Sequence, residues 1–371
     1  MQKRRLPQIK QKVSVSPTSV ATADRLKQSK NLLYSYGLDV IFALVLGFLL
    51  YYGLFGQSFS DVPIYACYAV AFWRGLPAAK ALSWPSCSFL SYPQNSFISN
   101  ATLVQWLQAH HWPGLLIQFV AGQNSNMPLH QLPYEYPLPT LIPFSLPLLF
   151  PYSWYLITFA ISMSLVAVVI YGLLRIFRSR WAAVVCALYL VVGGWATADG
   201  RFDLIPSALT LVAVILGARK RWNWAFAFLA LATIFKYYPF ILLIPFLLDQ
   251  QVQAGPGWRQ WRRFAPLATF VAICAVVMGI SLSLSIENTL APLQYYGNRP
   301  FQVESPAASL LWLSHLVGAR LDVAFVYGSF NLVSPLAPQV SLVNTILLST
   351  GLVYVGWLQW RGKIDLAAAC L

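Results

Sequence analysis

Residues 152–180 read YSWYLITFAISMSLVAVVIYGLLRIFRSR, a long apolar run that ends in a cluster of arginines. A helix needs about 20 residues to cross the roughly 30 Å of hydrocarbon in a bilayer, and Tyr152–Phe177 is long enough. Basic residues collect in the cytoplasmic loops of membrane proteins, so these arginines place the end of the span inside. This stretch predicts an integral membrane protein rather than a soluble domain.

The composition of the whole chain points the same way. Hydrophobic residues make up 58% of the 371 residues and charged residues 10%, against roughly half and a quarter in soluble domains. The 14 Trp and 19 Tyr suit side chains that anchor helix ends at the water–lipid interface. The net charge of +14 lies in short clusters between apolar blocks, which indicates membrane topology and argues against nucleic-acid binding.

The first 36 residues form a basic tail that carries a single acid, Asp24. Its polar, proline-containing composition predicts a disordered cytoplasmic segment that touches anionic lipid. The first apolar stretch starts only near Leu38, so we expect an uncleaved anchor rather than a signal peptide. We therefore divide the chain into a tail, 1–36, and a transmembrane domain, 37–371.

Working outward from residues 152–180 gives an all-α, polytopic helix bundle with about eight crossings and both termini inside. Two long polar stretches, 57–151 and 287–339, then lie outside as extracytoplasmic loops. Six of the 25 Lys and Arg also fall outside: Arg74, Lys80, Arg201, Lys236, Arg299 and Arg320. The expected crossings are Leu38–Gly56, Tyr152–Phe177, Trp181–Ala198, Asp203–Ala218, two arms within Trp222–Leu248, Phe264–Ile286 and Val340–Trp360.

The stretch Trp222–Leu248 has two interpretations. As one helix it leaves the arginines of residues 259–263 outside, whereas a hairpin turning at Lys236–Pro239 keeps them inside. We prefer the hairpin because it obeys the positive-inside rule, although each arm is short.

The outer loops contain segments that we expect to lie at the membrane surface. Leu103–Val120 predicts one surface helix with Trp106 and Trp112 at the interface. Pro137–Phe150 is apolar but short and rich in proline, which breaks helices, so it predicts a dipping or interfacial segment. A further surface helix is expected within 287–339.

The predicted outer face also collects most of the uncommon charged residues. Carboxylates and cations on one membrane face suit a reaction at an anionic phosphate, with one carboxylate as general base. The candidates are Asp61, Glu135, Asp199, Arg201, Asp203, Lys236, Tyr237, Arg299 and Glu304.

Structural roles compete with this interpretation for several candidates. Asp61 can start a loop turn, and Asp203 can cap a helix. Lys236 can extend to the lipid headgroups. Arg299 and Glu304 can pair with each other.

The cysteines and histidines give little support for metal or redox chemistry. Cys67 and Cys87 share the first outer loop and can pair in an oxidising compartment, but without a CxxC spacing we expect two unrelated thiols. No carboxylate stands at ligand spacing from the histidines, so no metal site is expected. The chain has no P-loop and no glycine-rich phosphate motif, which argues against nucleotide-driven chemistry.

Four stretches resemble the family 87 glycosyltransferases, polyprenol-phosphate-mannose-dependent enzymes of the GT-C superfamily, over residues from about 37 to 315. Two lie in the first outer loop: DVPIYACYAVAFWRGLP (61–77) and YEYPLPTLIPFSLPLLFP (134–151). The third runs from GRFDLIPS at residue 200 through FKYYPF to residue 248, and the fourth is NRPFQVESPAASLLW (298–312). The charged Arg201 and Asp203 depart from the polar amides that the family carries there.

The resemblance implies a membrane enzyme with its active site on the extracytoplasmic side of the cell membrane. Asp61 would deprotonate an acceptor hydroxyl on a glycan or glycolipid, the sugar carbon would invert, and neither metal nor cofactor would take part. Lys236 and Arg299, with Arg74 behind them, would hold the phosphate of a polyprenyl-phosphate mannose donor. The other implied substrate-binding residues are Tyr65, Glu135, Tyr136, Arg201, Asp203, Tyr237 and Glu304.

Two other functions fit the same sequence. One is a flippase or transporter for lipid-linked sugars, which predicts polar residues inside several spans. The other is a non-catalytic relative of the transferases. The predicted spans are clean and the charges gather at one face, so the transferase is the preferred hypothesis.

Overall fold

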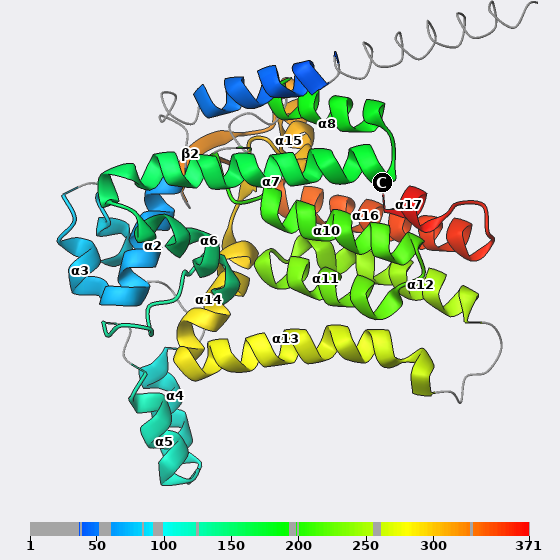
Figure 1. The fold of residues 1–371 in the computed structure, drawn as a ribbon. Helices are drawn as coiled ribbons and strands as arrows, with labels where there is room; N and C mark the ends of the chain where they lie inside the picture. The colour runs from blue at the N-terminus through cyan, green and yellow to red at the C-terminus, as the bar shows by residue number, and fades with distance from the viewer. Residues whose placement is uncertain are drawn as a thin grey trace, which may run out of the picture.

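The computed structural model describes residues 37, 39–51, 61–83, 85–91, 99–123, 126–192, 198, 200–254, 261–326 and 329–370, and these are mostly helical (Figure 1). The predicted tail, 1–36, lies outside the described residues. Within the described residues, three helices are long and apolar enough to cross a membrane: α7 (Tyr155–Phe177, preceded by the short turn η5, Tyr152–Trp154), α13 (Ala265–Leu284) and α16 (Ala337–Trp360).

Each of the other predicted crossings also contains a helix, but these helices are shorter. They are Asp39–Tyr51, α8 (Arg180–Val192), α10 (Leu204–Ala218), α11 (Trp222–Phe235) and α12 (Leu243–Gln253). A helix of 13 residues extends only about 20 Å, which is less than the hydrocarbon thickness. The segments of the predicted bundle are therefore present, whereas helix length alone supports three spans among the described residues.

Small residues let the central helices approach closely. Ala213 of α10 and Ala225 and Ala230 of α11 are fully buried where these two helices pack. A Cβ at Gly217 would lie 2.6 Å from the end of the Leu366 side chain, so a larger residue at this position in α10 would force Leu366 to shift. Small residues at such contacts are typical of helix packing within membranes.

The chain reverses between α11 and α12, as the hairpin interpretation predicts. The turn is the short 3₁₀ helix η6, Tyr238–Leu242. The ring of Phe246 lies 6.0 Å from the ring of Phe226, whereas one continuous helix would hold these residues about 30 Å apart. The turn brings Lys236 close to Asp203 at the start of α10.

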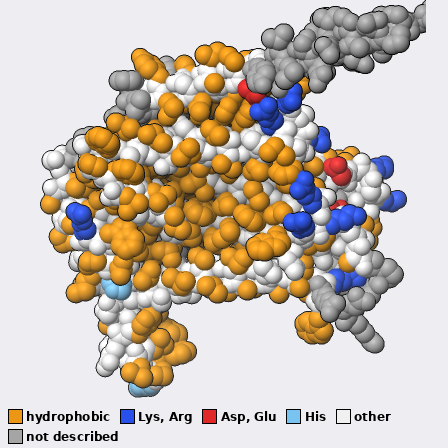
Figure 2. Space-filling view, viewed as in Figure 1, with side chains coloured by type: hydrophobic (Ala, Val, Ile, Leu, Met, Phe, Trp, Pro, Cys, Tyr) orange, Lys and Arg blue, Asp and Glu red, His pale blue; other side chains and the backbone are white. Residues whose placement is uncertain are grey.

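Positive charge gathers at one end of the bundle, which we call the basic end. It comprises the turns after α7, α10 and α16, with the short helices η7 (Trp261–Arg263) and α17 (Leu366–Ala369) nearby. Arg219 lies over the ring of Phe177 at 4.3 Å, which joins two of these turns. Figure 2 shows most of the visible Lys and Arg at this end, with a largely hydrophobic surface along the helices.

The opposite end is built from short helices. Asp61 precedes α2 (Val62–Arg74), which leads into α3 (Leu76–Lys80) and the turn η2 (Ser88–Ser91). The proline-rich stretch forms three short pieces, η3 (Leu138–Thr140), α6 (Leu141–Ser145) and η4 (Leu146–Leu149), as its prolines predict. Tyr65 of α2 stacks on Phe144 of α6, with ring centroids 4.1 Å apart.

Two predictions for the first outer loop were wrong. Leu103–Val120 is not one helix but two, α4 (Asn100–Ala109) and α5 (Gly114–Ala121), which project from the bundle (Figure 1). Pro113 cannot continue a helix, and His111 adopts a left-handed φ of 53° at the break. Cys67 and Cys87 form a disulfide rather than remaining free thiols, because α2 and the 85–91 segment pack together.

The second outer loop contains more structure than the predicted surface helix. It begins within α14 (Ile286–Asn298) and includes α15 (Pro306–Leu316). It also holds a three-stranded antiparallel sheet in the order β1 (Phe301–Gln302), β3 (Ser329–Val333), β2 (Asp322–Val326). The expectation of an all-α chain missed this sheet, although LDVAFVYGSFNLV (321–333) has the β-branched and aromatic residues typical of strands.

Candidate active site

The centre of the site is the start of α2, where two distant segments meet. The backbone N–H of Asp61 donates a hydrogen bond to the carbonyl of Gly200 at 3.2 Å. Pro63 occupies the first turn of α2, where proline is tolerated because its missing N–H has no partner within the helix. The first outer loop is thereby joined to the segment that starts α10.

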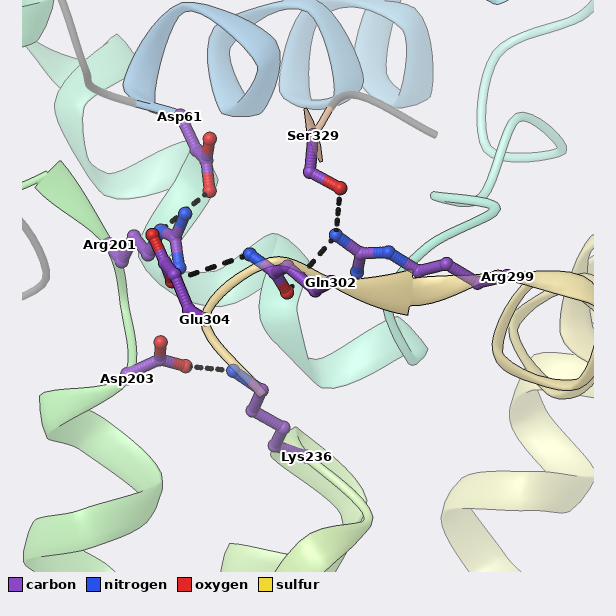
Figure 3. A network of polar contacts seen from close by, with 8 residues as sticks. All are labelled: Asp61, Arg201, Asp203, Lys236, Arg299, Gln302, Glu304 and Ser329. Carbon is purple, nitrogen blue, oxygen red and sulfur yellow. Dashed lines mark hydrogen bonds and ion pairs between the residues drawn. The ribbon is translucent and has the colours of Figure 1, made fainter. Parts of the chain in front are cut away.

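Two ion pairs follow from this junction (Figure 3). The Nε of Arg201 lies 3.1 Å from a carboxylate oxygen of Asp61. Two residues further along, the carboxylate of Asp203 forms an ion pair with the ammonium group of Lys236, which lies in the turn after α11. Asp203 stands at the N-cap position of α10, but its side chain caps no backbone N–H, so its contact is the lysine rather than the helix.

A third cation, Arg299, contacts the neutral side chains of Gln302, Ser329 and Tyr295. It follows α14, and its Nη2 donates to Ser329 Oγ at 2.6 Å and to Gln302 Oε1 at 3.3 Å (Figure 3). Its Nε is buried and has no hydrogen-bond partner among the described residues. The alternative role considered for Arg299, an ion pair with Glu304, is absent among the described residues, where Glu304 accepts a hydrogen bond from Gln302 at 3.5 Å.

These side chains surround one polar cavity of about 240 Å³. Its walls come from the start of α2, the 134–136 segment, the 201–203 segment, the turn after α11, the end of α14 and strands β1 and β3. The lining residues are Asp61, Ile64, Tyr65, Glu135, Tyr136, Arg201, Phe202, Asp203, Lys236, Tyr295, Tyr296, Arg299, Gln302 and Ser329.

Burial favours the protonated form of two carboxyls of the cavity, Asp61 and Glu135. Burial raises the pKa of Asp61 above its usual value, while Arg201 opposes this shift. Burial raises the pKa of Glu135 to about 7, and the negative charge of Asp61 acts in the same direction. A low-dielectric site disfavours an isolated charge, so Glu135 can take up or release a proton near neutral pH.

Eight of the sequence-predicted residues line this cavity, and three do not. Glu304 lies one hydrogen bond away, and Tyr237 lines a neighbouring cavity. Arg74 is exposed in the last turn of α2, at the far end of that helix from Asp61, and is not part of the cavity. Asp61 and Arg74 are close in the sequence. The 13-residue helix α2 nevertheless holds its last residue about 18 Å from its first, so Arg74 lies far from Asp61. Asp199 lies outside the described residues.

Several lining residues were missed by sequence reasoning. Tyr295, Tyr296 and Gln302 stand in YYGNRPFQ, beside Arg299, so the local aromatic cluster was an available signal. No signal in the sequence pointed to Ser329, because this residue contacts Arg299 only through the unpredicted pairing of β1 with β3.

A second cavity, of about 250 Å³ and largely apolar, adjoins the first and shares Tyr136 with it. Pro137, Leu138, Tyr237 and residues of α13 are among those that line it. A surface groove of about 510 Å³ shares Leu138, Pro139 and Val277 with this apolar cavity and lies between the proline-rich segment and α13. Polar and apolar spaces are thus adjacent.

The part of the chain that the structure describes brings together no group of three His, Cys, Asp or Glu that could hold a metal ion. The cavity instead presents three protein cations to a ligand: Arg201, Lys236 and Arg299. Fixed cations of this kind can stabilise negative charge on a phosphate.

The sequence profile of glycosyltransferase family 87 matches residues 134–371, which is more than half of the chain. The chain belongs to glycosyltransferase family 87. The matched range includes Glu135, Arg201, Lys236 and Arg299, whereas Asp61 precedes it. The range therefore begins and ends later than residues 37 to 315, over which the sequence resembled the family.

One relative with a described activity resembles part of this family 87 chain. It is GPI mannosyltransferase 1 of Trypanosoma brucei brucei, 29% identical over 121 residues. The alignment covers 31% of this chain and 28% of the relative, so the similarity concerns a segment rather than the whole protein. No solved structure matches the chain.

Proposed function

We propose that this family 87 glycosyltransferase is an integral membrane enzyme that transfers a hexose, with mannose expected, from a polyprenyl-phosphate donor to an acceptor hydroxyl. The observation that carries the proposal is the contact between a polar cavity holding three cations and an apolar cavity beside it. A donor with a sugar phosphate and a long isoprenoid chain needs both environments side by side. The name of the partial relative, a mannosyltransferase, supports the choice of sugar.

The phosphate is assigned to Arg299 and Lys236. Arg299 donates hydrogen bonds to neutral side chains, and its buried Nε has no hydrogen-bond partner among the described residues, so its charge is not balanced by a carboxylate there. Lys236 lies at the boundary between the two cavities, since Tyr237, the next residue, lines the apolar one. The isoprenoid chain would then extend past Tyr136 toward the groove beside α13.

In the proposed reaction Asp61 is the general base. It accepts the proton of the acceptor hydroxyl as the acceptor oxygen forms a bond to the anomeric carbon. The bond from that carbon to the phosphate oxygen breaks, and its electron pair stays on the departing polyprenyl phosphate, where Arg299 and Lys236 stabilise the growing charge. Attack opposite the leaving group inverts the anomeric carbon.

In the resting structure Asp61 is held by Arg201 at 3.1 Å. A carboxylate that is paired with an arginine is a weaker base. We infer that substrate binding moves Arg201 toward an anionic or hydroxyl group of the ligand and frees the carboxylate of Asp61 for proton transfer.

The orientation is also a proposal. Basic turns mark the cytoplasmic side of membrane proteins. Residues at the start of α2 line the cavity, and α2 lies at the end of the bundle opposite the basic end (Figure 1). We therefore propose that the active site faces the extracytoplasmic side of the cell membrane. The N-terminus and the turns after α7, α10 and α16 are then cytoplasmic.

The test is transfer by purified protein in lipid nanodiscs, supplied with labelled polyprenyl-phosphate mannose and a panel of glycan and glycolipid acceptors. Asp61→Asn should lower the transfer rate about 1,000-fold, within the usual range for a lost general base. The matched control is Asp322→Asn, at an exposed carboxyl in β2. Near-normal transfer by Asp61→Asn would contradict the general-base role proposed for Asp61. Absence of donor consumption by the wild type would contradict the proposed transferase activity.

A further inference from the structure

Glu135 differs from the other two carboxyl groups of the cavity. Asp61 pairs with Arg201 at 3.1 Å, and Asp203 pairs with Lys236. Glu135 forms no ion pair with any of the residues that the structure describes. When several carboxyls share a site, the one without a cation is the one that carries a proton.

The surroundings of Glu135 support a neutral side chain. It is partly buried, and burial raises its pKa to about 7; Asp61 also raises it, whereas Arg299 and the hydroxyls of Tyr134 and Tyr136 lower it. Tyr68, Tyr295 and Tyr296 contribute neutral phenols, because the pKa of each is raised. The charged and titratable groups that face the same space are Asp61, Tyr65, Tyr68, Tyr134, Tyr136, Arg201, Asp203, Lys236, Tyr295, Tyr296 and Arg299.

A phosphate bound at Arg299 makes this proton necessary. Glu135 and Arg299 line the same cavity and interact electrostatically. An ionised Glu135 would repel a bound phosphodiester, whereas a protonated carboxyl can donate its O–H to a phosphate oxygen. The negative charge of the donor itself also favours the protonated form of Glu135.

We propose that Glu135 binds the donor in its protonated form, with its carboxyl O–H donating a hydrogen bond to the donor's phosphate. Donor binding is then coupled to the presence of one proton on this side chain. The proposal rests on the proposed function, because it takes the ligand at Arg299 to be a polyprenyl-phosphate sugar. It gives Glu135 a role in donor recognition that is separate from the base function of Asp61.

The coupling has a defined pH dependence. Below pH 7 Glu135 is protonated in the free enzyme and the donor binds at full affinity. Above pH 7 each donor must bring a proton onto Glu135, so the dissociation constant rises about tenfold per pH unit, as for any single-proton linkage. A phosphodiester does not titrate in this range, so the donor itself contributes no such slope.

The experiment measures the dissociation constant of a short-chain isoprenyl-phosphate mannose from pH 5.5 to 9, without acceptor, for protein in nanodiscs. The wild type should show the tenfold slope above about pH 7. Glu135→Gln, whose amide donates a hydrogen bond at every pH, should bind within about threefold of wild type at pH 6 and show no slope. Glu135→Ala lacks the donor and should bind about tenfold more weakly at pH 6, again without a slope.

Two results would overturn the proposal: an unchanged slope in Glu135→Gln, or equal losses of affinity in Glu135→Gln and Glu135→Ala. The slope is a readout that simple misfolding does not produce, and the thermal midpoint of each variant is compared with that of Asp322→Asn. Binding with the predicted slope but without sugar transfer would refute the transferase and leave the Glu135 proposal standing. Failure of the wild type to bind this donor at any pH would refute both.

Discussion

The two ends of the helix bundle use arginine and lysine differently. At the basic end Arg219 lies over the ring of Phe177 at 4.3 Å and Arg361 over the ring of Trp357 at 5.4 Å. In the cavity Arg201 and Lys236 face carboxylates. Neither kind of contact belongs to one end alone, since Arg175 pairs with Asp39 and Lys236 lies 5.7 Å from the ring of Phe202. The cavity cations differ in lining one polar space, where they are positioned for an anionic ligand.

The two ends also differ in how strongly solvent screens their charges. Charges in the turns at the basic end meet water or lipid headgroups, where their interactions are screened. Charges in the cavity lie in a medium of lower dielectric constant, which strengthens their interactions and shifts the pKa of Asp61 and Glu135 upward. We therefore propose that the same residue types set topology at one end and serve chemistry at the other.

Among the arginines and lysines of the two ends, the largest effect is expected at Arg299. Arg299→Gln removes the cation that is assigned to the phosphate and should lower kcat/KM about 100-fold, as loss of one charge-stabilising group typically does. The matched control is Arg320→Gln, at an exposed arginine outside the cavity. Transfer assays on both variants in nanodiscs measure the difference. If both substitutions changed kcat/KM equally and only slightly, the proposed difference between cavity cations and peripheral cations would be wrong.

A substitution in the apolar cavity tests the path assigned to the isoprenoid chain. Val277 of α13 lines both the apolar cavity and the surface groove, whereas its neighbour Val276 is exposed and lines neither. Val277→Trp fills the path and should raise the KM of a long-chain donor about tenfold, as expected when a side chain occupies space that a ligand needs. A short-chain donor should be less affected, and Val276→Trp is the control. Equal effects of Val277→Trp on both donors would show that the isoprenoid chain does not occupy the apolar cavity.

The smallest expected effects compare two ion pairs. The Asp203–Lys236 pair lies in the cavity, and the Asp39–Arg175 pair, at 2.9 Å, joins the first described helix to α7. A double-mutant cycle with Asp203→Asn and Lys236→Met should give a coupling of about 1 kcal/mol in transfer activity. The cycle with Asp39→Asn and Arg175→Met should give a coupling near zero in transfer activity, because neither of these residues lines the cavity. Similar coupling in both cycles would argue that neither pair serves the site specifically.

Much of the fold followed from the sequence because hydrophobic length and charge position are local properties. Tyr152–Phe177 contains the helix α7, and the hairpin at Lys236–Pro239 is present. Proline also acts locally, so the broken segment at 137–150 was predictable. The number of crossings was less predictable, because packed helices such as α8 and α10 are shorter than a bilayer is thick.

The candidate site was predictable where a charged residue stands beside an apolar boundary, as Asp61, Lys236 and Arg299 do. Such residues are costly in a membrane protein and usually have a partner or a function. Contacts between distant segments were not predictable. The Cys67–Cys87 disulfide depends on the path of the chain between them, and Ser329 reaches Arg299 through strand pairing. Arg74 was misplaced because its helix carries it away from the cavity.

The most direct test of the central claim is the sidedness of the cavity relative to the basic end. Single cysteines are placed at Ser329, in the cavity, and at Lys220, in the turn after α10, with Cys186, Cys274 and Cys370 replaced and the Cys67–Cys87 disulfide kept. A membrane-impermeant thiol reagent added to intact cells should label position 329 and should reach position 220 only after the membrane is opened. Labelling of both positions from the same side would contradict an active site that faces away from the basic end.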